Sequence, residues 1–221
     1  MKDIKAIKGK FYIRGLIDEG EHEHQDFKYA ISDARKIARS ISAFANNDGG
    51  RLLVGVKDNG SIVGIPNEED IYMIEHAAEA YCNPPQEVEM TAFVADGGAV
   101  VLRATIMRAD SRPVYCIEEG NRHVAYYRVK DENLVAHPLM VEAWKLSADN
   151  NRFSTGALTE DDLSLLRHLE KAGETTPEAY MVSCHRSQRT SRDTIVRLLA
   201  MGIVEMVHRP DGFHLRHAAD D

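Results

Sequence analysis

Residues 21–65 read EHEHQDFKYAISDARKIARSISAFANNDGGRLLVGVKDNGSIVGI, and this stretch decides the fold. Apolar residues recur at helical spacing from Ala34 to Ala45, and basic residues take the opposite face. Ser32 or Asp33 can cap the start, since their side-chain oxygens accept bonds from free backbone N–H groups. Gly49-Gly50 favours a helix end, because glycine adopts the left-handed conformation at little cost. We therefore expect an amphipathic helix that ends before the glycine pair.

A β-hairpin is expected directly after this helix. Residues 52–56 are mostly apolar and branched, as in a strand, and Asn59-Gly60 is typical of a tight hairpin turn. Residues 62–65 then return as the second strand. The glycines inside the two strands, which leave room for close approach by another segment, are Gly55 and Gly64.

The next elements follow in a mixed order of helices and strands. A short strand is expected at 11–13 and a helix at 71–81. Two strand pairs are expected in succession, at 88–94 with 99–106 and at 113–117 with 124–129, and a short helix at 139–146 follows them. Successive strand pairs favour an α+β fold over a doubly wound parallel sheet.

A polar linker at 147–151 separates a second pattern of three helices and a hairpin. Thr159 and Asp162 form a capping-box pattern, with Asp in place of the usual Glu, at the start of the first helix. Further helices are expected at 176–182 and 191–201, and residues 203–207 and 213–215 form a hairpin. The domains predicted from this pattern are residues 1–147 and 152–221.

The motif "DFK … ISAFANNDGGRLLVGVKDNGSIVGI" resembles the AlbA-type domain that Schlafen proteins share, once labelled a divergent AAA domain. Residues 112–115 and 125–129 are similar to that domain's closing strands, so the resemblance covers about the first two-thirds of the chain. The second part resembles a winged helix-turn-helix in its element order, with "LLAMGIVE" as the most typical phrase. The resemblances imply a mixed-sheet AlbA/Schlafen-like domain followed by a C-terminal winged-helix domain.

Composition narrows the class of protein. The chain has 221 residues and three scattered cysteines, Cys82, Cys116 and Cys184, which indicate a reducing cytoplasm rather than a disulfide framework. No apolar run is long enough to span a membrane, so no membrane partner is expected, and no secretion signal is evident at the N-terminus. We expect a cytoplasmic, bacterial protein.

Charge distribution bears on nucleic-acid binding. The formal net charge is −8, yet from Cys184 to His217 six arginines stand against three carboxylates, a local net of +3. A locally basic module on an acidic protein is compatible with DNA. The arginines expected to contact duplex DNA, at the start of the third helix and at the hairpin tip, are Arg186, Arg189, Arg192 and Arg209. The expected function is a DNA-binding transcriptional regulator that acts as a homodimer; the alternative for these arginines is a solvated or protein-binding surface, which would make the protein an adaptor.

A second candidate site is acidic. In the ribonuclease branch of the Schlafen family three carboxylates bind a divalent metal and RNA is cut, and the matching residues here are Glu21, Asp26 and Asp58. This resemblance implies magnesium or manganese as the cofactor and RNA as the substrate of a metal-dependent endoribonuclease. Asp26 stands where that family has Glu, which displaces the carboxylate. The alternative is a solvated acidic loop, and we expect binding rather than catalysis as the main activity.

Two other cofactor patterns are weaker. His22 and His24 stand at alternate positions, so they could share one strand face and bind zinc. No Cys or His pair elsewhere in the sequence completes a zinc-site spacing. The Gly49-Gly50 turn lies in a domain once given an ATP-binding label, but the chain contains no G-x-x-x-x-G-K-[ST] loop. We therefore expect neither zinc nor ATP.

Overall fold

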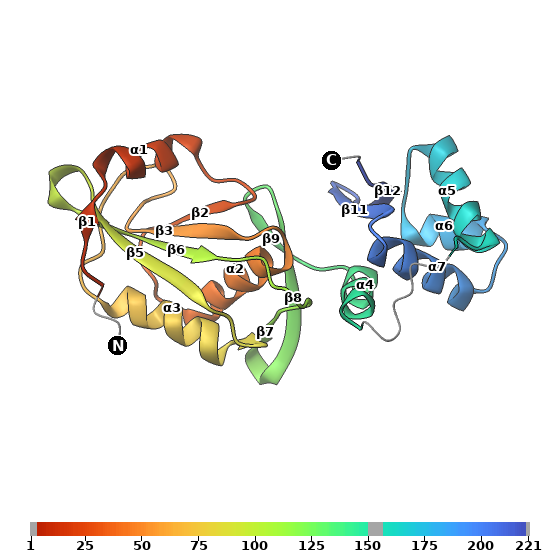
Figure 1. Cartoon of the computed structure of the whole chain (residues 1–221), viewed down its shortest axis with the longest axis horizontal. Helices are drawn as coiled ribbons and strands as arrows, with labels where there is room; N and C mark the ends of the chain where they lie inside the picture. Colours follow the sequence, from red (N-terminus) through yellow and green to blue (C-terminus); the bar gives the residue numbers. More distant parts are fainter. Residues whose placement is uncertain (1–3, 150–156, 220–221) are drawn as a thin grey trace. The chain divides into compact units, whose positions relative to one another are not determined.

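The structure, a computed structural model, describes residues 4–149 and 157–219 (Figure 1). The chain divides into two compact units. The first contains the chain up to Asp110 together with Val114–Val135, and the second contains Ser111–Pro113 together with the chain from Ala136 onward. Both units combine helices with mixed or antiparallel sheet, which confirms the expected α+β class.

The first unit is built on a five-stranded sheet in the order β1-β5-β6-β3-β2. The sheet is mixed, because β1 pairs with β5 and β2 pairs with β3 in parallel, whereas the β5–β6 and β6–β3 pairs are antiparallel. Its strands are β1 (Ile7–Lys8), β2 (Gln25–Lys28), β3 (Gly50–Val54), β5 (Val88–Val94) and β6 (Val100–Ile106).

Three helices cover the two faces of this sheet (Figure 1). Helix α1 (Lys10–Glu19) lies on one face, and α2 (Ala34–Asn46) and α3 (Glu69–Ala80) lie on the other. The side chain of Asp33 accepts bonds from the backbone N–H groups of Arg35 and Lys36, at 2.9 and 3.4 Å, so the expected helix and its N-cap are confirmed. Helix α3 confirms the helix expected at 71–81.

A second sheet of four strands, in the order β4-β7-β8-β9, packs against the other side of α2. The strands are β4 (Cys82–Asn83), β7 (Tyr115–Glu118), β8 (Arg122–Val129) and β9 (Glu132–Val135), and single 3-10 turns lie at Asp96–Gly98 and Glu119–Asn121. Helix α2 is therefore buried between two sheets, and most of its residues are inaccessible to solvent. Both expected strand pairs, β5–β6 and β7–β8, are confirmed.

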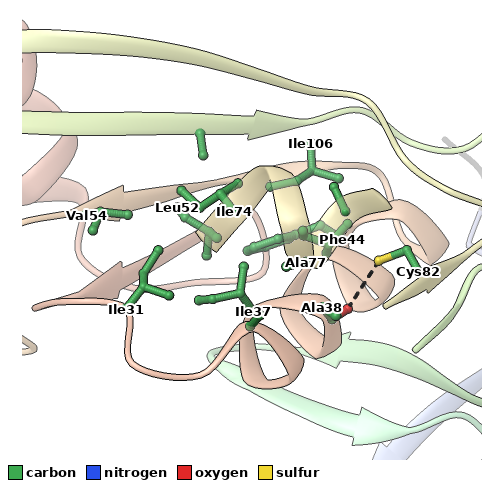
Figure 2. Close-up of a cluster of buried hydrophobic side chains, with 14 of the residues drawn as sticks. Ile31, Ile37, Ala38, Phe44, Leu52, Val54, Ile74, Ala77, Cys82 and Ile106 are labelled. Atoms are coloured by element: carbon green, nitrogen blue, oxygen red, sulfur yellow. Dashed lines mark hydrogen bonds between the residues drawn. The ribbon is translucent and has the colours of Figure 1, made fainter. Parts of the chain in front are cut away.

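The main core lies where α2 and α3 pack on the first sheet (Figure 2). Ile37 and Phe44 of α2 contact this core beside Leu52 of β3 and Ile74 of α3, and all four side chains are buried. Cys82 lies at its edge, with its Sγ 3.8 Å from the carbonyl oxygen of Ala38. Burial raises the pKa of the Cys82 thiol to about 12, so this cysteine behaves as a small apolar side chain.

Two local expectations were wrong. Residues 11–13 belong to helix α1, because Ile13 and Leu16 are spaced to bury one helical face against the sheet. The strand expected at 62–65 is reduced to one bridge between Val56 and Ile62. Instead the carbonyl of Gly55 accepts bonds from two successive N–H groups, those of Val63 and Gly64, and a Cβ on Gly55 would lie 2.8 Å from the Gly64 backbone. The space left by glycine is thus filled by the chain itself.

The second unit contains four helices and a three-stranded sheet within the described residues. The helices are α4 (Pro138–Ala148), α5 (Glu160–Ala172), α6 (Pro177–Ser183) and α7 (Gln188–Ala200). The sheet has the order β10-β12-β11, with β10 (Glu174–Thr175), β11 (Val204–Arg209) and β12 (Gly212–His217). The capping box of Thr159 and Asp162 is confirmed at the start of α5.

Helix α4 belongs to the second unit, because it packs against α7. By contacts, the chain from Ala136 onward groups with Ser111–Pro113 in the second unit, whereas the sequence places the linker at 147–151. Of those residues, 147 and 148 are in α4, and 150 and 151 lie outside the described residues. In the ranges that the structure describes, no helix has the length and apolar character needed to cross a membrane.

Candidate functional site

The ISAFANN motif at the end of α2 joins that helix to the second sheet. The Asn46 amide nitrogen donates to the carbonyls of Val114 and Tyr126, at 2.8 and 2.9 Å, and its oxygen accepts the Val114 N–H at 2.8 Å. Ser42, one turn earlier, donates to the Val114 carbonyl at 2.8 Å and accepts the Tyr126 N–H at 3.1 Å. These buried bonds give the motif a structural role, since backbone groups of two segments depend on it.

Asn47 and Arg128 extend this connection toward β2. The Asn47 amide binds both the N–H and the carbonyl of Arg128, at 3.1 and 2.8 Å. The Arg128 side chain is 1% exposed; its guanidinium lies 3.5 Å from an Asp26 carboxylate oxygen and 5.0 Å from the Phe44 ring centroid. It also donates to Asn133 Oδ1 at 2.9 Å. A buried cation with these partners fixes β8 and β9 against β2 and α2.

Glu21 and Asp26, two of the three carboxylates named for metal binding, lie together at the start of β2. A carboxylate oxygen of Glu21 accepts the Phe27 N–H at 2.8 Å, and burial together with the hydrogen bond to Asp26 raises the pKa of Glu21. Lys28 Nζ lies 2.7 Å from Asp26 Oδ2, because residues two apart on a strand share a face. Asp26 is therefore neutralised by Lys28 and Arg128.

Asp58, the third of these carboxylates, is exposed in the turn after β3. Over the described ranges, no group of three His, Cys, Asp or Glu side chains is placed to hold a metal ion. The residues present thus do not fit the magnesium or manganese site that the Schlafen ribonuclease resemblance implies. His22 and His24 are engaged locally instead: His22 Nδ1 accepts the His24 N–H at 3.2 Å, and His24 Nδ1 lies 3.1 Å from the Gly49 carbonyl.

A further polar cluster at the surface of α2 carries no motif that would reveal it from sequence. Arg39 contacts the Glu118 carboxylate through two nitrogens, at 2.6 and 2.7 Å, and the Tyr126 hydroxyl donates to Glu118 at 2.6 Å. The Arg39 hydrogen bond is the main cause that lowers the pKa of Glu118 to about 2. Burial and the bond to Glu118 raise the pKa of Tyr126 to about 12. The partners of Arg39 are far apart in the chain, so sequence spacing does not predict them.

Helix α7 presents one of the predicted arginines openly. Ser187 caps the helix by accepting the Thr190 N–H at 3.0 Å, which places Arg189 in the first turn. The Arg189 side chain is 92% exposed, and its nearest carboxylate is that of Asp193, at 3.9 Å on the next turn. Such a pair on a helix surface is weak, so the Arg189 guanidinium is available to a ligand.

The other three predicted arginines have carboxylate partners. Arg192 Nε lies 3.1 Å from Glu142 of α4, and a second nitrogen contacts the same carboxylate. Arg186 lies 2.8 Å from Asp161 of α5. Arg209, at the end of β11, lies 2.9 Å from Glu174 of β10. All three guanidinium groups remain partly exposed, so each pair is open to water and to competing anions.

Comparison with known proteins places the chain in a family. The family described as "Schlafen, AlbA_2" matches residues 21–137, more than half of the chain, so the chain belongs to the Schlafen AlbA_2 family. The match runs from Glu21, just before β2, to His137, just after β9. No curated protein matches the chain.

Two solved structures match parts of the chain at low identity. The crystal structure of the DIP2311 protein from Corynebacterium diphtheriae is 18% identical, with a TM-score of 0.43, and the match covers 86% of this chain but 34% of that one. The solution structure of the N-terminal domain of a protein titled "Putative ATP-dependent DNA Helicase RecG-related Protein", from Nitrosomonas europaea, is 23% identical, with a TM-score of 0.41, and the match covers 60% of this chain and 96% of that one. The chain thus spans about a third of the length of the first of these proteins.

Proposed function

We propose that this protein binds duplex DNA through its second unit and acts as a transcriptional regulator. The element order α5-β10-α6-α7-β11-β12, with β12 between β10 and β11, supports assigning a winged helix-turn-helix to this unit. In that arrangement α7 is the recognition helix and the β11–β12 hairpin is the wing. The observation that carries the proposal is the 92% exposure of Arg189 in the first turn of α7.

The arginines would contribute in a definite order. Arg189 meets DNA first, because the N-terminal residues of a recognition helix approach the base edges and its guanidinium has only a weak partner. Arg192 and Arg209 must release Glu142 and Glu174 before they bind phosphate. Exposed ion pairs of this type contribute little, so the exchange costs little and recovers charge-assisted bonds to phosphate.

The first unit is better suited to binding than to hydrolysis in this proposal. Lys28 and Arg128 lie against Asp26, where a catalytic metal would need a free carboxylate. A positively charged group at that position competes with a cation for the same oxygens. We therefore rank DNA binding as the first function. The second is a metal-dependent endoribonuclease that uses Glu21, Asp26 and Asp58, and the third is a protein-binding adaptor.

The domain organisation is also a proposal. We place the boundary between Val135 and Ala136, because α4 packs on α7. Without α7, the apolar side of α4 would be exposed to solvent. We expect a fragment of residues 136–221 to show cooperative thermal unfolding by circular dichroism. A fragment of residues 152–221 should be less stable, because Leu139, Met140, Ala143 and Trp144 of α4 are buried. Equal stability of the two fragments would contradict this boundary.

A homodimer is proposed because helix-turn-helix proteins commonly match two-fold operators with two-fold symmetry. Sedimentation equilibrium of the full chain, with and without duplex, gives its mass directly. A monomer mass in the absence of DNA, with a single chain bound to an operator of two half-sites, would contradict the dimer and leave DNA binding itself intact.

The decisive experiment for DNA binding is selection of duplex fragments from the source genome, followed by fluorescence anisotropy at several salt concentrations. We expect affinity to fall with salt, and Arg189→Ala to weaken binding by about 1–3 kcal/mol if it contacts a base. Arg167→Ala, which removes an exposed arginine of α5, is the matched control and should change affinity little. If the wild type binds no duplex at low salt, the proposal fails, and binding of an RNA or protein in its place would favour one of the alternatives.

A further inference from the structure

One face of the first sheet is only partly covered by α1. Side chains of alternate residues on β3, β5 and β6 point to this face, and Leu53, Phe93 and Val101 are buried there under the helix. Farther along the same strands, Arg51 lies opposite Thr105, and Thr105 lies opposite Glu89. This polar row lines a cavity of about 410 Å³. The cavity lies beyond the part of the sheet that α1 covers.

Arg103 of β6 has an unusual position in this cavity. Its guanidinium carbon lies 5.6 Å from the ring centroid of Tyr12 and 5.5 Å from that of Phe93, and one terminal nitrogen contacts the Tyr12 hydroxyl. Its Nε is buried and has no hydrogen-bond partner within the described part of the chain. None of the ion pairs found in residues 4–149 and 157–219 includes Arg103. A cation–π contact offsets part of the cost of burying this charge, but the donor remains unmet.

Two further arginines line the cavity, and both are already oriented. Arg51 is held by the Gln25 side chain, at 2.7 Å, and by Glu19. Arg108 is held by Asp48 at 2.8 Å. Each uses only some of its five donors, so each can still donate to a ligand. His24 adds a ring nitrogen, since only its Nδ1 faces the Gly49 carbonyl.

Acidic groups limit what the cavity accepts. Asp48 and Glu89 also line it, but Asp48 is paired with Arg108, and Glu89 lies on the strand beyond Thr105. With Glu19, which contacts Arg51, three carboxylates stand against three arginines, and Arg103 is the arginine of this cavity that has no carboxylate partner among the described residues. A ligand with one compact anionic group and a planar or hydroxyl-bearing remainder fits this distribution, because the half-exposed ring of Tyr12 lies beside Arg103 and Glu89 can accept a hydroxyl.

We propose that the cavity formed by Arg51, Arg103, Arg108 and Tyr12 is a phosphate-binding site that takes the phosphoryl group of a nucleotide or of a single-stranded nucleic acid. The unmet Nε of Arg103 binds one phosphate oxygen, and Arg51 and Arg108 bind others; arginine donors match this geometry. The Tyr12 ring stacks on the base, as aromatic side chains do in sequence-tolerant binding of single strands. This site is in the first unit and does not depend on duplex binding by α7.

The test follows individual NMR signals of the full chain during titration. The probes are inorganic phosphate, AMP, adenosine as the control without phosphate, and a short oligothymidylate. The Nε–H signal of Arg103 is assigned by its loss in Arg103→Gln. We expect phosphate and AMP to shift this signal and the amides of Gly49 and Gly50 in a saturable way, whereas adenosine should not. Saturation by AMP alone identifies a nucleotide site, and displacement of oligothymidylate by AMP at the same signals identifies a single-strand site.

The matched control is Arg122→Gln, which removes an exposed arginine of β8 outside the cavity. Arg103→Gln should weaken AMP binding by about tenfold or more, and Arg122→Gln should leave it unchanged. The proposal is overturned if phosphate and AMP leave the Arg103 signal in place, or if they shift the signal of Arg122 equally. If Arg103→Gln is unfolded, the wild-type amides of Gly49 and Gly50 decide: saturable shifts by phosphate and AMP but not by adenosine support the site, and their absence overturns it.

Discussion

Two arginine–carboxylate pairs of the first unit lie in a different environment from the pair of Arg192 and Glu142 in the second. Arg128 and Asp26 are almost fully buried, and Glu118 is buried beneath Arg39. In the pair of Arg192 and Glu142, by contrast, the side chains are 44% and 41% exposed. Buried pairs are costly to break, whereas exposed pairs contribute little to stability. The comparison indicates that an arginine–carboxylate pair stabilises the fold where its carboxylate is buried, and that it can exchange partners where both side chains are exposed.

The comparison is not one of whole units. Arg197 of α7 contacts Asp162, which is completely buried and also accepts the Thr159 N–H at 2.7 Å. This pair connects α7 to the start of α5 and belongs with the buried pairs of the first unit. Burial of the carboxylate, rather than membership of a unit, therefore predicts which pairs are structural.

The largest effect is expected for Arg128→Met. Removal of this cation leaves the Asp26 carboxylate buried with Lys28 alone and removes the bond to Asn133. We expect the free energy of unfolding of the first unit to fall by about 3–5 kcal/mol. Arg122→Met on the same strand is exposed and should change it by less than about 0.5 kcal/mol. Urea denaturation measures the free energy of unfolding of both variants. Equally small changes would show that burial of an arginine does not determine how much it stabilises the fold.

A somewhat smaller loss is expected for Asn46→Ala. The variant leaves the Val114 N–H and the Tyr126 carbonyl without their side-chain partner in a buried position. Unsatisfied buried groups of this kind should lower the free energy of unfolding by about 2–3 kcal/mol. Asn67→Ala removes an exposed amide that accepts the Glu69 N–H, and its loss should be about 1 kcal/mol or less. A denaturation midpoint for Asn46→Ala no lower than that of Asn67→Ala would remove the structural role assigned to the ISAFANN motif.

Glu118→Gln should alter stability at acidic pH. The Arg39 bond lowers the folded-state pKa of Glu118 from 4.5 to about 2, so its stabilising contribution is present above 4.5 and is lost as the pH falls from 4.5 toward 2. Since Arg39 is partly exposed, we expect a contribution of about 2 kcal/mol. Urea midpoints of the wild type should fall more steeply over this range than those of the variant. Parallel curves would show that the pair does not stabilise the fold.

Local sequence patterns predicted several helices of this fold, because the hydrogen bonds that start those helices join residues close together in the chain. The α2 helix follows from apolar spacing and an Asp33 cap, and the α5 start follows from Thr159 and Asp162, three residues apart. The strand expected at 62–65 failed because the N–H groups of Val63 and Gly64 both bind the Gly55 carbonyl, so residues 62–65 form no regular ladder with residues 52–56. The same apolar residues suit either arrangement, and only tertiary contacts decide between them.

The sites were less predictable, because their partners are distant in the chain. The arginine stretch at 186–192 marked α7, but its spacing does not reveal that Glu142 lies fifty positions before Arg192. Similarly, Arg39 and Glu118 meet only when β7 packs on α2. The Lys28 contact with Asp26 could have been anticipated, since residues two apart on a strand share a face. Long-range pairing requires the fold, whereas pairing within one strand does not.

The exchangeable character of the α7 pairs is the central claim, and Glu142→Gln tests it most directly. This variant releases Arg192 without changing α7 itself, and Glu160→Gln, which releases Arg167 of α5, is the control with the same charge change. The measurement is the salt dependence of duplex DNA affinity by fluorescence anisotropy. We predict that Glu142→Gln raises affinity by a factor of about 1.5–5 and steepens the salt slope by about one phosphate contact, beyond any change in the control. The same affinity and slope as the control would contradict the claim, because Arg192 would then be a structural residue and not a DNA contact.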